Sequence, residues 1–225
     1  MDDVRSIFTI FRKELLQEWR SRAVTVATLF FAGVVLVVLA FALGPDELTM
    51  RNAAPGVLWT ALAFTGVISA SQSYQNELEE DALEQLLLYP IPRATIYLGK
   101  LLANWLYMMV LGAVMLPVTG LLFGAPFGEN WGLLWITVAL GTLGFALIAC
   151  FYAALTANLR ARESLLPVLM FPVVVPILQA SVRASGEIAG LGDLNVARDW
   201  LQLLLGFDLV YLVTCTALFH FVMEA

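Results

Sequence analysis

The sequence predicts an all-α integral membrane protein with six transmembrane helices, and three observations lead to that fold class. Of its 225 residues, 60% are hydrophobic and 13% are charged, about half the charged fraction of an average soluble domain. Six long segments carry almost no charge: 23–45, 52–76, 101–128, 130–159, 164–182 and 200–223. Each can cross a hydrocarbon core, which takes about 20 helical residues. Their apolar residues are continuous rather than alternating, which argues against an outer-membrane β-barrel.

An amphipathic helix over 2–20 is expected to precede the first span and to lie in the cytoplasmic membrane interface. Its apolar residues recur at helical spacing, and the polar positions between them include Arg5, Arg12, Lys13, Glu14 and Arg20. The apolar residues are Val4, Ile7, Phe8, Phe11, Leu15 and Trp19. A simple basic stop before the first span is the alternative interpretation.

The spans are expected at about 23–43, 53–74, 101–123, 131–159, 164–182 and 200–223, within one transmembrane domain that covers residues 1–225. The fifth contains three prolines within ten residues, Pro167, Pro172 and Pro176. Because proline lacks the N–H group that a helix needs, we expect this span to be bent or broken. Broken membrane helices face protein or a water-lined path, so these prolines are candidate functional residues.

Asp208 and His220 interrupt the sixth span. A charge at the bilayer centre costs about 2.5 kcal/mol or more, which makes a deep Asp208 a candidate functional residue. If the span instead starts nearer Leu203, Asp208 lies close to the outer interface, and the sequence leaves both positions open. His220 falls in the last cytoplasmic turn, where a cation interacts favourably with the helix C-terminus. A helix-capping or interface role is therefore favoured over a role in binding haem or protons.

The distribution of Lys and Arg predicts the orientation. Nine of the twelve lie before the first span or in the connections after the second and fourth spans: Arg5, Arg12, Lys13, Arg20, Arg22, Arg93, Lys100, Arg160 and Arg162. Only Arg51, Arg183 and Arg198 lie on the other side. The positive-inside rule therefore places both termini in the cytoplasm.

The connection 75–100 is the only cytoplasmic segment long enough to be a docking device. It begins with acidic residues, continues with a leucine stripe and is stopped by prolines. The candidate docking residues are Glu77, Leu78, Glu79, Glu80, Asp81, Leu83, Glu84, Gln85, Leu86, Leu87, Pro90 and Pro92. Acidic groups are repelled by anionic lipid, so a short helix here suits a basic protein groove with an apolar floor. The alternative is a solvated helix packed on its own bundle.

The sequence predicts no catalytic residues and no metal site. Gly99-Lys100 resembles the end of a P-loop, but Ala94 and Leu101 stand where that motif needs Gly and Ser or Thr. Asp193 follows Gly190-Leu191-Gly192 as in intramembrane aspartyl proteases, yet it lies in a polar non-cytoplasmic loop. Cys150 and Cys215 lie in apolar segments and neither begins a haem-attachment motif.

Two stretches resemble the haem exporter B family, the permease subunits of the bacterial cytochrome c maturation ABC transporter. One is Pro55-Gly56-Val57-Leu58-Trp59, and the more specific one is the run 77–92, which contains Ala82-Leu83-Glu84-Gln85-Leu86-Leu87-Leu88 before Pro90 and Pro92. The resemblance implies an ABC-2-type (type V-like) permease fold in the bacterial inner membrane. It also implies that the N-terminal helix and the 77–92 run contact an ATPase.

The resemblance further implies a set of partners. They are a cytoplasmic ABC ATPase subunit that binds ATP and Mg, a second copy of the chain, other haem-handling membrane subunits and a periplasmic haem chaperone. Haem is then a handled substrate, and no cofactor is bound by this chain.

Three other functions stay open. The chain could be an ABC-2 permease for a lipid, polysaccharide or drug, against which only the 77–92 run argues. It could be part of an ATP-driven scaffold that releases haem-loaded chaperone without moving haem, an alternative that the shortage of haem ligands supports. It could also be a proton-coupled transporter using Asp208, although the docking-like segment counts against this.

Overall fold

The computed structural model describes residues 2–79, 92–127, 130–157, 162–191 and 193–222. Within these ranges every regular secondary-structure element is a helix. Six helices are long and apolar enough to cross a membrane: Val24–Leu43, Glu47–Gln75, Arg93–Phe123, Trp131–Thr156, Leu165–Gly190 and Leu194–Phe219. The all-α membrane fold with six spans is therefore confirmed.

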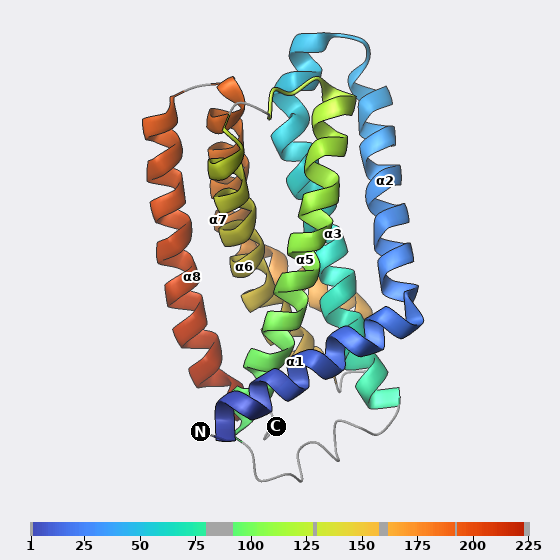
Figure 1. The fold of residues 1–225 in the computed structure, drawn as a ribbon, viewed down its shortest axis with the longest axis vertical. Coiled ribbons are helices and arrows are strands. Elements are labelled where there is room, and N and C mark those ends of the chain that lie inside the picture. Colours follow the sequence, from blue (N-terminus) through green and yellow to red (C-terminus); the bar gives the residue numbers. More distant parts are fainter. Residues whose placement is uncertain (1, 80–91, 128–129, 158–161, 192, 223–225) are drawn as a thin grey trace.

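The first helix, α1 (Asp2–Ser21), lies across the lower part of the bundle, in front of α5 and α3 in Figure 1. It joins α2 (Ala23–Leu43) through Arg22, which adopts a left-handed conformation with φ 52°. Few residues other than glycine adopt positive φ, so Arg22 marks a specific change of direction rather than a helix that simply continues. The N-terminal helix was predicted, and it is turned against the bundle by this single residue.

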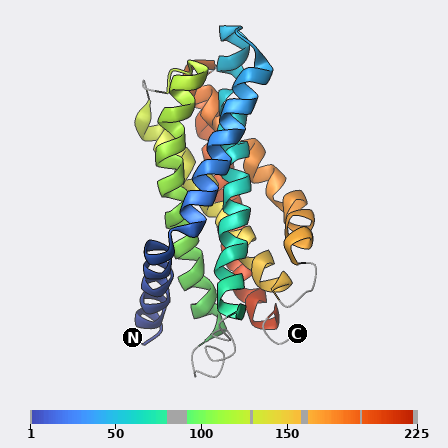
Figure 2. The same ribbon diagram turned by 90° about the vertical axis from the view of Figure 1, so that its right-hand side faces the viewer.

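The remaining helices run up and down along the long axis (Figures 1 and 2). They are α3 (Glu47–Glu79), α5 (Arg93–Phe123), α6 (Trp131–Thr156), α7 (Arg162–Gly186), the π-helical turn η1 (Glu187–Leu191) and α8 (Leu194–Val222). The core lies around α6, where every residue from Phe145 to Cys150 is buried. In α2 only Thr28, Ala32 and Leu36 are buried, so this helix is peripheral and mostly available to lipid.

Several helices begin earlier than their apolar segments. α3 starts at Glu47 rather than near 53, α5 at Arg93 rather than 101, and α8 at Leu194 rather than 200. Charged residues end an apolar run, but they do not end a helix, because the backbone keeps its hydrogen bonds in the interface. The prediction of a single connection over 75–100 is wrong in extent, since residues 75–79 complete α3 and 93–100 begin α5.

The prolines of α7 do not break it. The helix is continuous from Arg162 to Gly186 and contains all three. Pro172 is exposed, and Pro167 and Pro176 are half-buried, so none of the three lies in the core. The departure from helical geometry comes later, at Ala189 and Gly190, where Gly190 has φ 78°. The span was predicted to be bent or broken, and the break is the part that is wrong: an apolar surrounding favours keeping every remaining backbone hydrogen bond.

Close helix contacts depend on α6 glycines and on side chains that bond across the bundle. A Cβ atom at Gly141 would lie 2.8 Å from Cζ3 of Trp59. The same Trp59 donates its Nε1 hydrogen to Oγ of Ser185 over 2.9 Å. Tyr97 donates its hydroxyl hydrogen to the Leu147 carbonyl over 2.8 Å. Small residues and interhelical hydrogen bonds are the contacts that hold helices together in lipid, where apolar burial alone gives little.

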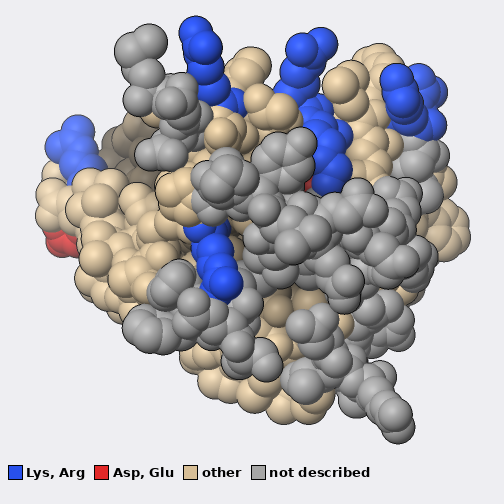
Figure 3. Space-filling view, turned by 90° about the horizontal axis from the view of Figure 1, so that it is seen from below, with Lys and Arg blue, Asp and Glu red and all other residues tan. Residues whose placement is uncertain are grey.

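The two ends of the bundle differ in charge. Seen from the end that carries α1, Lys and Arg side chains stand around the surface, and few acidic side chains of the described residues are visible (Figure 3). The C-terminal part of α8 reaches this same end (Figure 1). Arg51, Arg183 and Arg198 belong to the opposite end, near the starts of α3 and α8 and the end of α7.

Candidate functional site

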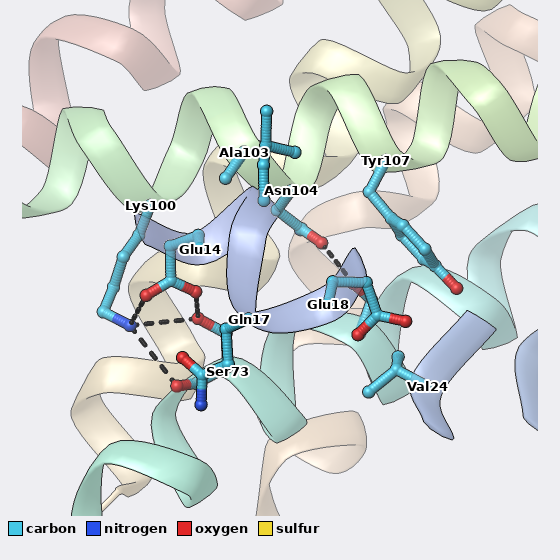
Figure 4. Close-up of a pocket in the computed structure, with 11 residues that line it drawn as sticks. Glu14, Gln17, Glu18, Val24, Ser73, Lys100, Ala103, Asn104 and Tyr107 are labelled. Carbon is cyan, nitrogen blue, oxygen red and sulfur yellow. Dashed lines mark hydrogen bonds and ion pairs between the residues drawn. The ribbon is translucent and has the colours of Figure 1, made fainter. Parts of the chain in front are cut away.

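A polar cluster joins α1, α3 and α5 at the basic end of the bundle (Figure 4). Its centre is Lys100 of α5, whose Nζ lies 3.0 Å from Oε1 of Glu14 in α1. The same Nζ donates to Oγ of Ser73 in α3 over 3.0 Å. Ser73 in turn donates its hydroxyl hydrogen to Oε2 of Glu14 over 2.7 Å. We call Glu14, Ser73 and Lys100 the coupling cluster.

The coupling cluster is almost closed to solvent. The side chain of Lys100 is 1% exposed and that of Glu14 is 10% exposed. Lys100 also lies over the ring of Tyr74, 4.5 Å from its centroid. A buried ammonium group needs a carboxylate and further acceptors to offset its lost hydration, and here it has both. Losing any one member would leave the others in an unfavourable surrounding.

The backbone around the cluster brings α1 unusually close to α5. A Cβ atom at Gly99 would lie 2.8 Å from Cβ of Ile10 and 3.2 Å from the Ile7 carbonyl oxygen. Ile10 is buried, whereas Val4, Phe8 and Trp19 of the predicted apolar stripe are largely exposed. α1 therefore uses one face to contact protein and leaves its aromatic face available to lipid.

A second set of bonds extends the connection to α2. Glu18 of α1 accepts hydrogen bonds from the backbone N–H of Thr25 over 2.8 Å and from its hydroxyl over 2.5 Å. Thr28 of α2 shares a hydrogen bond with Tyr107 of α5. Glu18 and Tyr107, together with the coupling cluster, line a small pocket of about 60 Å³ between α1, α3 and α5. A displacement of α1 would therefore act on three membrane helices at once.

The predicted docking segment flanks this cluster. Most of its candidate residues, from Glu80 to Pro90, lie outside the described residues, so that interpretation stays a prediction. Glu77, Leu78 and Glu79 form the last turn of α3, and Pro92 immediately precedes α5. Ser73 and Lys100 thus lie on the two helices that lead into and out of the segment.

Asp208 is not part of the coupling cluster. It lies midway along α8 and is 3% exposed. The alternative that placed it at the outer interface is wrong, because α8 begins at Leu194 and carries Asp208 deep into the bundle.

The remaining candidate ligands are dispersed. Cys150 on α6 and Cys215 on α8 are buried free thiols. His220 belongs to the last turns of α8, and its side chain lies outside the described part of the structure. Among the described residues, no three His, Cys, Asp or Glu side chains are grouped so that they could hold a metal ion.

Comparison with known proteins decides the family. The family model described as CcmB protein matches residues 5–223, almost the whole chain. The chain belongs to the CcmB protein family. Heme exporter protein B of Pseudomonas aeruginosa is 29% identical over 205 residues, which cover 87% of this chain and 91% of the relative. The Paracoccus denitrificans protein of the same name is 32% identical over 165 residues, 73% of this chain and 75% of the relative.

Sequence reasoning missed the coupling cluster of this CcmB family member. From the sequence, Lys100 is only part of an incomplete P-loop match and one of the nine basic residues that predict the orientation. Glu14 is only a polar position of an amphipathic helix. One signal was available: Lys100 directly precedes the long uncharged segment 101–128, so a helix that starts before it must carry a charge into the bundle. The partner could not be identified, because Glu14 reaches Lys100 only after Arg22 turns α1 against α5.

Proposed function

We propose that this chain is a membrane subunit of an ABC transporter complex that couples ATP hydrolysis by a partner to haem delivery during cytochrome c maturation. Family membership over residues 5–223 supports the complex, and the name of the relatives, heme exporter protein B, supports haem as the substrate. Six spanning helices support the role of membrane subunit. The chain carries no catalytic motif, and ATP with Mg binds to the partner ATPase.

The coupling cluster carries the proposal that this chain transmits work. A conformational change in an ATPase is transmitted to a membrane helix through packed side chains and through hydrogen-bond and salt-bridge networks. The Lys100–Glu14 pair, 3.0 Å apart and nearly closed to water, provides such a contact between α1 and α5. Ser73 adds α3, the helix that leads into the predicted docking segment.

The proposed assembly follows from the charge distribution and from the geometry of ATPases. Nine of the twelve basic residues lie on one side, so both termini face the cytoplasm of a bacterium, and the chain resides in its inner membrane. ABC ATPases close around two nucleotides, so two copies of this chain are proposed to face each other in the complex. Other haem-handling membrane subunits and a periplasmic haem chaperone complete it, and this chain itself holds no cofactor.

Purification of the chain with its ATPase tests this function. We expect the two to co-purify, and we expect ATP hydrolysis to rise when haem and the haem chaperone are both present. Hydrolysis that responds to a lipid, polysaccharide or drug and ignores haem would instead favour a permease of that class. Hydrolysis that drives chaperone release without haem crossing the membrane would favour the scaffold function.

A further inference from the structure

Asp208 sits in the middle of α8, equally far from Leu194 and Val222. Its side chain faces a junction of α6, α7 and α8 and is 3% exposed. Gly144 of α6 makes room for it, because a Cβ atom at that position would overlap Oδ1 of Asp208 and lie 2.7 Å from Cδ1 of Ile177. The carboxyl group is therefore buried beside Gly144 of α6 and Ile177 of α7.

Nothing in the described part of the chain compensates a charge there. Neither carboxyl oxygen of Asp208 has a hydrogen-bond partner among the described residues. Tyr211, one turn away, donates instead to the Val173 carbonyl, and Tyr97 of α5 donates to Leu147.

The other ionisable groups on the packed helices lie elsewhere along the bundle. Among the described side chains they are Cys150 and Tyr152 on α6, Cys215, Arg198 and Asp199 on α8, Arg183 on α7, Glu187 in η1, and Arg93, Lys100 and Tyr107 on α5. Lys100 is paired with Glu14, and Arg183, Arg198 and Asp199 are exposed toward the opposite end. Among the described side chains, none of these groups forms a hydrogen bond with the carboxyl group of Asp208.

We propose that Asp208 is an intramembrane proton-binding site that holds α8 against α6 and α7 only while it is protonated. A carboxylate without counter-charge or donors is strongly disfavoured in an apolar site, whereas the neutral acid is tolerated. Separation of α8 admits water, and Asp208 then releases its proton to that water. The resulting anion resists return to the apolar junction, so the protonation state selects between the closed and open arrangements.

The proposal goes beyond haem delivery and does not depend on it, because the ligand is a proton and the moving part is α8. It can be tested on the purified chain in lipid nanodiscs. The first measurement is infrared difference spectroscopy with ¹³C-labelled aspartate. We expect a protonated-carboxyl C=O band at neutral pH that is absent from Asp208→Asn and kept in Asp199→Asn, the matched control on the exposed end of α8.

The second measurement uses the native thiol Cys215, which lies two turns from Asp208 on the buried face of α8. In a Cys150→Ala background, Cys215 is labelled with a membrane-permeant maleimide at increasing pH. Dividing the rate by that of Asp208→Asn at each pH removes the reactivity of the thiol itself. We expect the ratio of the parent rate to the Asp208→Asn rate to rise at least tenfold between acidic and alkaline pH. For the control, the ratio of the Asp199→Asn rate to the parent rate should not change with pH.

Two results would overturn the proposal. A folded protein without the protonated-carboxyl band at neutral pH would mean that Asp208 is ionised and held by a cation. A labelling ratio that does not change with pH would mean that protonation of Asp208 does not control the position of α8.

Discussion

Nζ of Lys100 lies 3.0 Å from Oε1 of Glu14, at the point where α1 crosses the start of α5. The two residues are 86 positions apart in the sequence. Their pairing converts a helix expected to rest on the membrane surface into part of the bundle. Three of the predictions below concern this contact or the docking segment beside it.

Breaking the pair on one side should destabilise the protein more than removing both charges. Lys100→Met leaves the nearly buried Glu14 with only its longer, 3.8 Å ion pair to the exposed Lys13, and should lower the free energy of unfolding by about 3 kcal/mol. Glu14→Gln should have a similar effect, and the double variant should lose less than the sum. A double-mutant cycle measured by denaturant unfolding in detergent checks this. Additive losses would mean that the two residues do not interact in solution.

The docking segment should be required for the ATPase but not for membrane insertion. Leu83→Glu combined with Leu87→Glu places charges on the predicted apolar stripe and should remove the ATPase from the purified complex. Leu48→Glu, at the exposed opposite end of the bundle, serves as the control and should retain it. Undiminished co-purification of the ATPase with the double variant would refute the docking role of 77–92.

The close approach of α6 to α8 should not tolerate a methyl group at position 144. Gly144→Ala places a Cβ atom against Asp208 and Ile177, and overpacking of this kind costs about 1–3 kcal/mol. Gly206→Ala, where a Cβ atom meets nothing within 4 Å, is the matched control and should be neutral or slightly stabilising. Thermal unfolding followed by circular dichroism measures both. Equal melting temperatures would mean that the junction is looser than described.

Haem handling should not depend on the single histidine. Because the sequence places His220 in the last cytoplasmic turn of the sixth span, where a cation suits the helix C-terminus, His220→Ala should leave cytochrome c maturation largely intact. The measurement is the haem-stained cytochrome c content of cells, with insertion of the variant checked by immunoblot. Loss of maturation together with loss of a haem absorbance band from the purified chain would identify His220 as a ligand.

The sequence predicted the fold because the bilayer imposes a simple rule on length and charge. The six uncharged segments became the six spans, and 2–20 became α1. Helix starts were misplaced, since Arg93 and Leu194 extend helices into the interface where charge is tolerated. The depth of Asp208 depends on where α8 begins. The sequence placed the start of the sixth span at about 200, six residues after the observed start, and this left open whether Asp208 lies inside the bundle or at the outer interface.

The coupling cluster could not be predicted from the hydrophobic periodicity of the sequence, for a different reason. Each member of the coupling cluster is unremarkable on its own helix, and only the turn at Arg22 brings Glu14 to Lys100. The α7 prolines show the opposite case, because they predict a local break in the helix that the folded bundle does not contain. Their missing hydrogen bonds occur on faces outside the core, so the helix continues to Gly186.

The central claim is that the coupling cluster transmits work from the ATPase to the membrane helices. The direct measurement compares ATP hydrolysis with haem transferred to the chaperone, in the reconstituted complex carrying either the parent chain or Lys100→Met. Arg198→Met, an exposed basic residue at the opposite end of the bundle, is the control. We predict that Lys100→Met keeps at least half of the parent's ATP hydrolysis while haem transferred per ATP falls about tenfold or more. An unchanged amount of haem transferred per ATP in a complex with the ATPase bound would contradict the account.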